Sequence, residues 1–262
     1  MNNGLKKILP IFKWQLIIIL TLLISTGILI IFGNPGFTQN THLTLFPSYP
    51  RGSLLLSNSG ATSPKTHPLP PSLENWHDTT NSGDYFEQIQ TTKYGYLIWS
   101  KFPIQVNIET PTNINPKQAE KWVNQVTQAI MEWNNYLPLK LVEEPENSDI
   151  KITRKRPPLQ IDPETKIPRA RSALTTYQIY TQNDILTHKF TILLSPSQTG
   201  KYLQAAARHE MGHALGIWGH SLLQTDALYF SQVREPVAIS NRDVNTLKKI
   251  YQQSTSLGWD IN

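Results

Sequence analysis

The pentapeptide HEMGH, residues 209–213, constrains this chain more than any other part of its sequence. Residues four apart on an α-helix lie on one face, so His209 and His213 can present their imidazoles to a single metal ion. In this pattern Glu210 reaches the water on the metal instead of the metal itself. Because the 262 residues include no cysteine, any zinc has to be held by histidine and carboxylate. The pentapeptide therefore predicts a helical zinc site whose general base is Glu210.

The residues after this pentapeptide extend it to HEMGHALGIWGHS. The longer pattern resembles the metzincin signature, and among metzincins it is most similar to the matrixin peptidases. Their pattern is His-Glu-x-x-His-x-x-Gly-x-x-His followed by Ser. The resemblance implies that His209, His213 and His220 bind one catalytic Zn²⁺ ion and that Glu210 is the catalytic base.

The loop before the third histidine is one residue longer here than in that family. Gly216 is expected to end the motif helix, because glycine readily takes the left-handed backbone that follows a helix. By the resemblance it also turns the chain back toward the metal. His220 stands four residues after Gly216 instead of three, and we expect Gly219 to absorb the extra residue as a bulge. Asp226 and Glu235 are poorer candidates for the third ligand, since they lie further along the chain.

A second departure concerns the floor of the zinc site. Metzincins place a methionine in a tight turn beneath the zinc, and the segment TDALYF offers Leu228 at the matching position. Leucine is apolar and of similar size, so it can form the floor, although it lacks the flexible thioether. Tyr229 matches a tyrosine of the family, and we assign it no chemistry.

The resemblance extends weakly over about residues 94–252. It implies an α+β fold, a metzincin-like (zincin) catalytic domain with a mixed, twisted sheet and long helices. The residue patterns predict Asn115 as the N-cap of a long amphipathic helix with Pro116 in its first turn. Ser240 and Asp243 form a capping box before the last helix. Strands are predicted in the segments YGYLIWSKFPIQVNIE, LKLVEE, SDIKITRK, SALTTYQIY and HKFTILLS.

The N-terminal part of the chain has a different composition. Residues 14–32, WQLIIILTLLISTGILIIF, carry no charge over a length close to that of a bilayer core, and three lysines precede them. We therefore predict a signal-anchor or transmembrane helix within residues 1–33 that places the rest of the chain outside the cytoplasm. Cleavage of this segment would instead give a secreted protein. Residues 34–82 are rich in Pro, Ser and Thr, which predicts a linker, and the peptidase domain is expected at 83–262.

Charge and composition limit the kinds of partner that we expect for this chain. The net charge of +5 comes partly from lysines before the apolar run, and the other basic residues are interspersed with acids, so no nucleic acid is expected as a partner. We expect a monomer that meets the membrane through its N-terminal helix. The structural Ca²⁺ of the family cannot be traced, because residues 154–172 lack a cluster of Asp and His.

Two interpretations of function remain open. The first is a zinc-dependent endopeptidase that hydrolyses peptide bonds of extracytoplasmic proteins or peptides. The alternative is a catalytically inactive, metzincin-like binding module, which Leu228 and the shifted His220 leave open. The resemblance suggests that a peptide substrate pairs as an added strand with SALTTYQIY, residues 172–180. The basic loop beside this segment would favour acidic partners only if its arginines point inward; otherwise it is a solvated surface.

Overall fold

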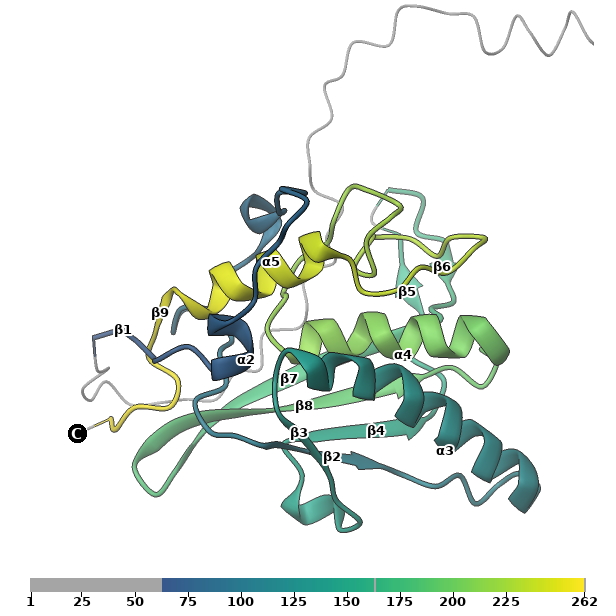
Figure 1. Ribbon diagram of the computed structural model, residues 1–262. Helices are drawn as coiled ribbons and strands as arrows, with labels where there is room; N and C mark the ends of the chain where they lie inside the picture. Colours follow the sequence, from purple (N-terminus) through teal and green to yellow (C-terminus); the bar gives the residue numbers. More distant parts are fainter. Residues whose placement is uncertain (1–62, 163, 262) are drawn as a thin grey trace, which may run out of the picture. The chain divides into compact units, whose positions relative to one another are not determined.

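In the computed structural model, which describes residues 63–162 and 164–261, a five-stranded sheet carries two long helices on one face (Figure 1). These helices are α3 (Pro116–Met131) and α4 (Gly200–Ala214), which pack against each other and against the sheet. A further helix, α5 (Asn241–Tyr251), lies beside the end of α4, where the Tyr251 hydroxyl donates to the Leu215 carbonyl at 3.0 Å. The arrangement is the α+β fold that the sequence predicts.

The sheet is mixed, with the order β3-β2-β4-β8-β7. The pairs β2–β3, β2–β4 and β4–β8 are parallel, and β7–β8 is antiparallel. Each strand overlaps one of the five predicted segments. The bounds are β2 (Ile104–Ile108), β3 (Leu139–Leu141), β4 (Ile150–Arg154), β7 (Ala173–Gln182) and β8 (Ile185–Leu194).

Strand β7 is an edge of this sheet, as the prediction for SALTTYQIY requires. It pairs with β8 along its whole length, from Ala173 opposite Leu194 to Gln182 opposite Ile185. Asn183 and Asp184 join the two strands with φ angles of 49° and 61°, the left-handed pair that a two-residue hairpin turn needs. The other edge of β7 is left without a partner strand among the described residues.

Helix α3 forms where its capping residues predict it. The Asn115 side chain accepts a hydrogen bond from Lys117 N at 2.9 Å, and Pro116 occupies the first turn. The helix buries Ala119, Trp122, Val126, Ala129 and Ile130. Trp133, just after it, donates from its indole N–H to the Arg208 carbonyl of α4 at 2.9 Å. This contact fixes α3 beside the helix that carries the HEMGH motif.

The packed part of the chain begins upstream of the expected boundary at residue 83. Strand β1 (Lys65–Thr66) pairs antiparallel with β9 (Ser254–Thr255), and Leu73 in α2 (Pro71–Glu74) is fully buried. Trp76 donates to Asn245 of α5 at 2.9 Å. The Pro-rich composition misleads here, because these residues order against α5 through contacts between distant parts of the chain.

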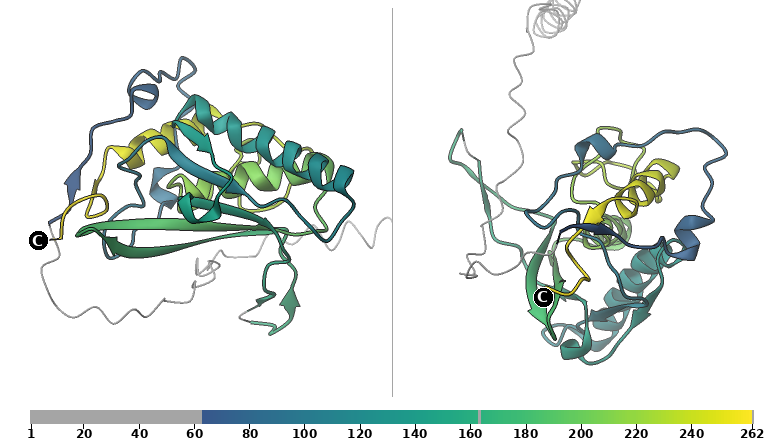
Figure 2. Two further views of the ribbon diagram at one scale, coloured as in Figure 1. Left: turned by 90° about the horizontal axis from the view of Figure 1, so that it is seen from below. Right: turned by 90° about the vertical axis from the view of Figure 1, so that its left-hand side faces the viewer.

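Short elements complete the described part. They are the 3₁₀ helices η1 (Phe86–Gln88), η2 (Glu132–Asn135) and η3 (Pro145–Asn147), and the hairpin of β5 (Gln160–Ile161) and β6 (Pro168–Arg169), which projects from the body in Figure 2. Within residues 63–162 and 164–261, the helices are too short or too polar to cross a bilayer. The predicted anchor in residues 1–33 and most of the predicted linker lie outside the described residues.

Candidate active site

The HEMGH motif lies on α4, and the helix ends immediately after it. Gly216 N donates to the His213 carbonyl at 3.1 Å and Ile217 N to the Gly212 carbonyl at 3.1 Å, which is the hydrogen-bond pattern of a Schellman motif. Gly216 has φ 120°, and a Cβ there would collide with the Leu97 carbonyl oxygen. Glycine at this position therefore allows the sharp reversal that the sequence predicts.

The reversal brings the three predicted histidines together. His213 Nε2 lies 3.1 Å from His209 Nε2 and 3.2 Å from His220 Nε2, and all three ligand atoms fall within 4.8 Å of one another. Two nitrogens bound at about 2.0–2.1 Å to a tetrahedral zinc would be about 3.3 Å apart. The cluster thus has the donor atoms and the spacing that zinc requires, and no second such group is found in the described part of the chain.

Backbone carbonyls orient two of the imidazoles through the Nδ1 atoms, the ring nitrogens that are not in the cluster. His209 Nδ1 lies 2.9 Å from the Ala227 carbonyl, and His213 Nδ1 lies 2.7 Å from the Ile217 carbonyl. A carbonyl can only accept, so both Nδ1 atoms carry the proton and donate. In the neutral rings the Nε2 atoms then present lone pairs to the centre of the cluster, which is the tautomer that a metal ligand needs.

Burial favours the neutral, metal-binding form of His213 and His220. It lowers the pKa of His213 well below its ordinary value, and the neighbouring His220 and His209 lower it further. Burial, with a smaller effect of His209, lowers the pKa of His220 to about 3. Both imidazoles are therefore neutral near pH 7, with a nitrogen lone pair available for a cation.

Two consecutive tight turns take up the extra residue before His220. Trp218 N donates to the Gly216 carbonyl at 2.7 Å, and Gly219 N donates to the Ile217 carbonyl at 3.0 Å, the pattern of γ-turns. Gly219 is not among the residues with positive φ, so these turns do not depend on a left-handed backbone at this position. Glycine is needed for a different reason, because a Cβ there would collide with the Gln88 carbonyl oxygen of the segment packed over the loop.

Replacing Gly219 by alanine is expected to weaken zinc binding by about tenfold or more, since over-packing costs about 1–3 kcal/mol. The added Cβ would also lie 2.9 Å from the Gln88 carbonyl carbon, so the loop that carries His220 has to shift. Competition with a chelator of known affinity measures the change. Gly200→Ala is the control, because its Cβ meets nothing within 4 Å and the strain from its φ of 54° falls on the first residue of α4, not on the loop of His220. Equal zinc affinities for the two variants would contradict the role given to Gly219.

Glu210 lies beside the cluster and is held by the edge strand. The Thr175 hydroxyl, on β7, is 2.6 Å from Glu210 Oε2 and 3.1 Å from the Glu210 carbonyl. Burial raises the pKa of Glu210, while His209, the Thr175 hydroxyl and the charge of Arg171 oppose that rise. Sequence reasoning missed Thr175, because β7 and α4 meet only in the tertiary structure. The alternation of buried side chains on β7 is the one signal that could have indicated it.

Leu228, at the position predicted to correspond to the methionine turn, packs against α4 at Gly212. It is fully buried, and a Cβ at Gly212, between the two motif histidines, would lie 2.6 Å from its Cδ2 atom. The turn that carries Leu228 is held by Asp243 of α5, whose carboxylate accepts from Ala227 N at 2.9 Å and from the Tyr85 hydroxyl at 2.6 Å. Because Ala227 also orients His209, α5 helps to position a candidate ligand.

The other candidates for a third ligand are engaged elsewhere. Asp226 accepts hydrogen bonds from Ser221, Ser240 and Arg242, and its side chain is fully buried. Glu235 forms an exposed ion pair with Lys201 at 2.8 Å. His220 is therefore the residue in this region whose side chain meets the two motif histidines.

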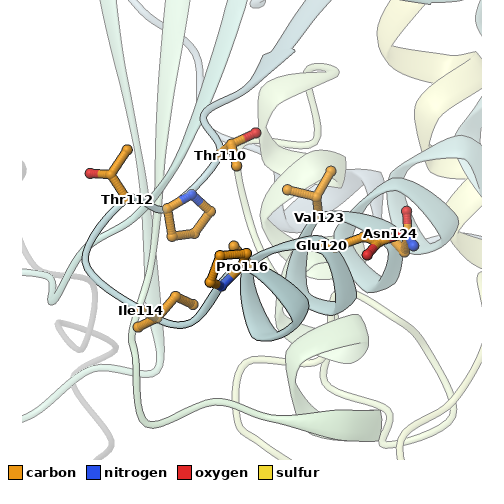
Figure 3. Close-up of a pocket in the computed structure, with 9 residues that line it drawn as sticks. Thr110, Thr112, Ile114, Pro116, Glu120, Val123 and Asn124 are labelled. Carbon is orange, nitrogen blue, oxygen red and sulfur yellow. The ribbon is translucent and has the colours of Figure 1, made fainter.

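A separate pocket of ≈ 520 Å³ lies between the β2–α3 loop and the first turns of α3 (Figure 3). Its walls are mostly apolar or hydroxylated, with Pro111, Ile114 and Val123 among them, and Glu120 is its one ionisable group. No histidine of the cluster lines it. The pocket therefore lacks the groups for hydrolysis, which are concentrated at the end of α4.

The chain matches the model of a known protein family. The family model for matrixins matches residues 98–252, more than half of the 262-residue chain. The chain belongs to the matrixin family. No curated protein shows significant similarity to it. Membership and the three-histidine cluster together make this protein a matrixin-like metzincin and indicate a zinc metallopeptidase.

Proposed function

We propose that this matrixin is a zinc-dependent endopeptidase that hydrolyses peptide bonds of proteins or peptides outside the cytoplasm. The convergence of three histidine Nε2 atoms carries the proposal, since two of the rings are oriented by backbone carbonyls. His209, His213 and His220 would hold the zinc ion. When bound, zinc polarises a carbonyl and lowers the pKa of a bound water to about 7.

The protein's own residues handle the protons. The Glu210 carboxylate accepts the proton of the attacking water and later donates it to the leaving amine. The Thr175 hydroxyl, 2.6 Å from Oε2, holds one oxygen of this carboxylate, so the other is available to the reacting water. Buried surroundings exclude bulk water from the carboxylate, which strengthens its interactions with charge that develops nearby.

The outer edge of β7 supports the expected mode of substrate binding. Its backbone has no partner strand among the described residues, and its Thr175 contacts Glu210. An extended peptide that pairs with this edge would pass directly above the histidine cluster, with its backbone amides bound as in a sheet. The edge thus favours an extended polypeptide as substrate.

The location outside the cytoplasm remains a prediction from residues 1–33, as does the monomeric state. The alternative of an inactive binding module finds no support in the site. Leu228 is fully buried, and His220 Nε2 lies 3.2 Å from His213 Nε2 despite the longer loop. Neither departure from the family pattern removes a group that hydrolysis needs.

Removal of the metal is expected to abolish peptidase activity reversibly. Purified full-length protein should contain about one zinc ion per chain and cleave casein, and dialysis against 1,10-phenanthroline should remove both zinc and activity. Zinc, but not magnesium, should restore cleavage, because imidazole ligands suit zinc and magnesium prefers oxygen. Cleavage that persists in the metal-free protein would refute the proposal.

A further inference from the structure

Arg171 differs from the other arginines of the basic loop between β4 and β7. Arg156 and Arg169 are exposed, and Arg169 pairs with Asp162 at 3.2 Å. Arg171 is half-buried, and its Nε atom is buried with no hydrogen-bond partner among the described residues. The basic loop was expected to favour acidic partners only if its arginines point inward. Arg171 is the residue that fits this condition.

Arg171 lies two residues before the strand that lines the catalytic site. Backbone pairing continues upstream of β7 to Ser172, whose carbonyl accepts a hydrogen bond of 2.9 Å from the segment after β8. Arg171 precedes Ala173 by two residues, across a bend at Ser172, and Ala173 and Thr175 share the buried face of β7. This face meets α4, where Thr175 contacts Glu210, and the charge of Arg171 acts on the same carboxylate.

The guanidinium group lacks a fixed counter-ion. Arginine carries five N–H donors and stays charged at physiological pH. None of the ion pairs within the described residues involves Arg171, and leaving a buried N–H without an acceptor costs free energy. A carboxylate that arrives with a ligand would supply both the acceptor and the opposite charge.

We propose that Arg171 is a specificity-determining residue that binds a substrate carboxylate on the C-terminal side of the scissile bond. The proposal rests on the endopeptidase function proposed above. Arg171 lies just before β7, which passes Glu210 at Thr175 and continues to Tyr177, whose ring packs on Trp218 at a ring-centroid distance of 4.9 Å. A peptide added antiparallel, the more stable pairing, therefore places its C-terminal side next to Arg171.

Two sources can supply this carboxylate, and matched peptides distinguish them. One series of internally quenched peptides carries Glu or Gln at each of the three positions after the scissile bond. A second series consists of short peptides whose last residue is at one of these three positions, with the C-terminus either a free carboxylate or an amide. We expect the full-length protein to cleave the carboxylate member of at least one series with a kcat/KM about 10- to 100-fold higher, as for a charge-assisted hydrogen bond. A preference in the first series indicates an acidic side chain, and one in the second series a C-terminal carboxylate.

Substitutions of Arg171 test whether this residue causes the preference for carboxylate peptides. Arg171→Met should bring the kcat/KM ratio of each pair close to one while the neutral peptides are still cleaved. Arg171→Lys should keep part of the preference, because lysine retains the positive charge but lacks the paired N–H donors of the guanidinium group. Arg156→Met, at an exposed position of the same loop, is the matched control and should leave the ratio unchanged. A ratio equal in the parent and in both Arg171 variants would overturn the proposal.

A binding measurement separates this inference from the proposed function. Fluorescence anisotropy of the labelled peptides on the zinc-loaded full-length protein does not require turnover. A preference for the carboxylate peptide that Arg171→Met removes would support the subsite even if the parent cleaved nothing, in which case the endopeptidase proposal alone would fail. Equal affinities for the carboxylate and neutral peptides would overturn the subsite.

Discussion

Glu210→Gln is expected to lower kcat for peptide hydrolysis by about 1,000-fold or more, while zinc content stays at the level of the parent. General acid–base catalysis contributes about 10²- to 10⁴-fold, and the amide can neither accept nor return the proton. The substitution keeps the shape of the side chain, and the amide oxygen can still accept from the Thr175 hydroxyl. Quenched-peptide kinetics and metal analysis on the same preparation measure both quantities.

Glu120→Gln is a suitable control for this variant, because Glu120 lies exposed on α3 beside the separate pocket. Its kcat should equal that of the parent. A Glu210→Gln protein with full activity would exclude Glu210 as the base. A parent that binds zinc fully but has no activity on any peptide would favour the inactive binding module.

His220→Ala is expected to weaken zinc binding by more than about 100-fold and to abolish activity. Loss of a group that only orients a metal ligand already costs about 10- to 100-fold in affinity, and loss of a ligand should cost more. His220 Nε2 lies 3.2 Å from His213 Nε2, and the two nearby carboxylates are occupied with other partners. No side chain in this region can readily replace it. Competition with a chelator gives the affinity.

His77→Ala is the matched control, because His77 is exposed and lies outside the cluster. Circular dichroism of both variants establishes that they are folded. Full zinc content and full activity in His220→Ala would show that another group completes the site, and the assignment of the late histidine would then be wrong.

Short-range interactions explain why much of the fold was predictable. The Asn115 cap, the capping box of Ser240 and Asp243, and the helix end at Gly216 each depend on residues within a few positions of one another. The strands followed from alternation of apolar residues. The spacing of His209 and His213 likewise follows from one turn of helix. Such features can be predicted from a single sequence.

Contacts between distant segments explain what the sequence could not reveal. Residues 65–76 look like a linker by composition, yet they order because Leu73 and Trp76 find partners in the packed body. Gly219 looks like a flexible bulge, yet its lack of a side chain matters because Gln88 packs against it.

The sequence by itself determined the chemistry available to this protein: two histidines and a glutamate on one helix, followed by a turn and a third histidine. Only the tertiary structure decided how these groups are oriented. Ala227 positions His209, Thr175 holds Glu210, and the charge of Arg171 acts on the same carboxylate. The physical reason is that hydrogen bonds and charges act over a few ångströms in space, whereas these partners are separated from the helix by up to several tens of residues along the chain.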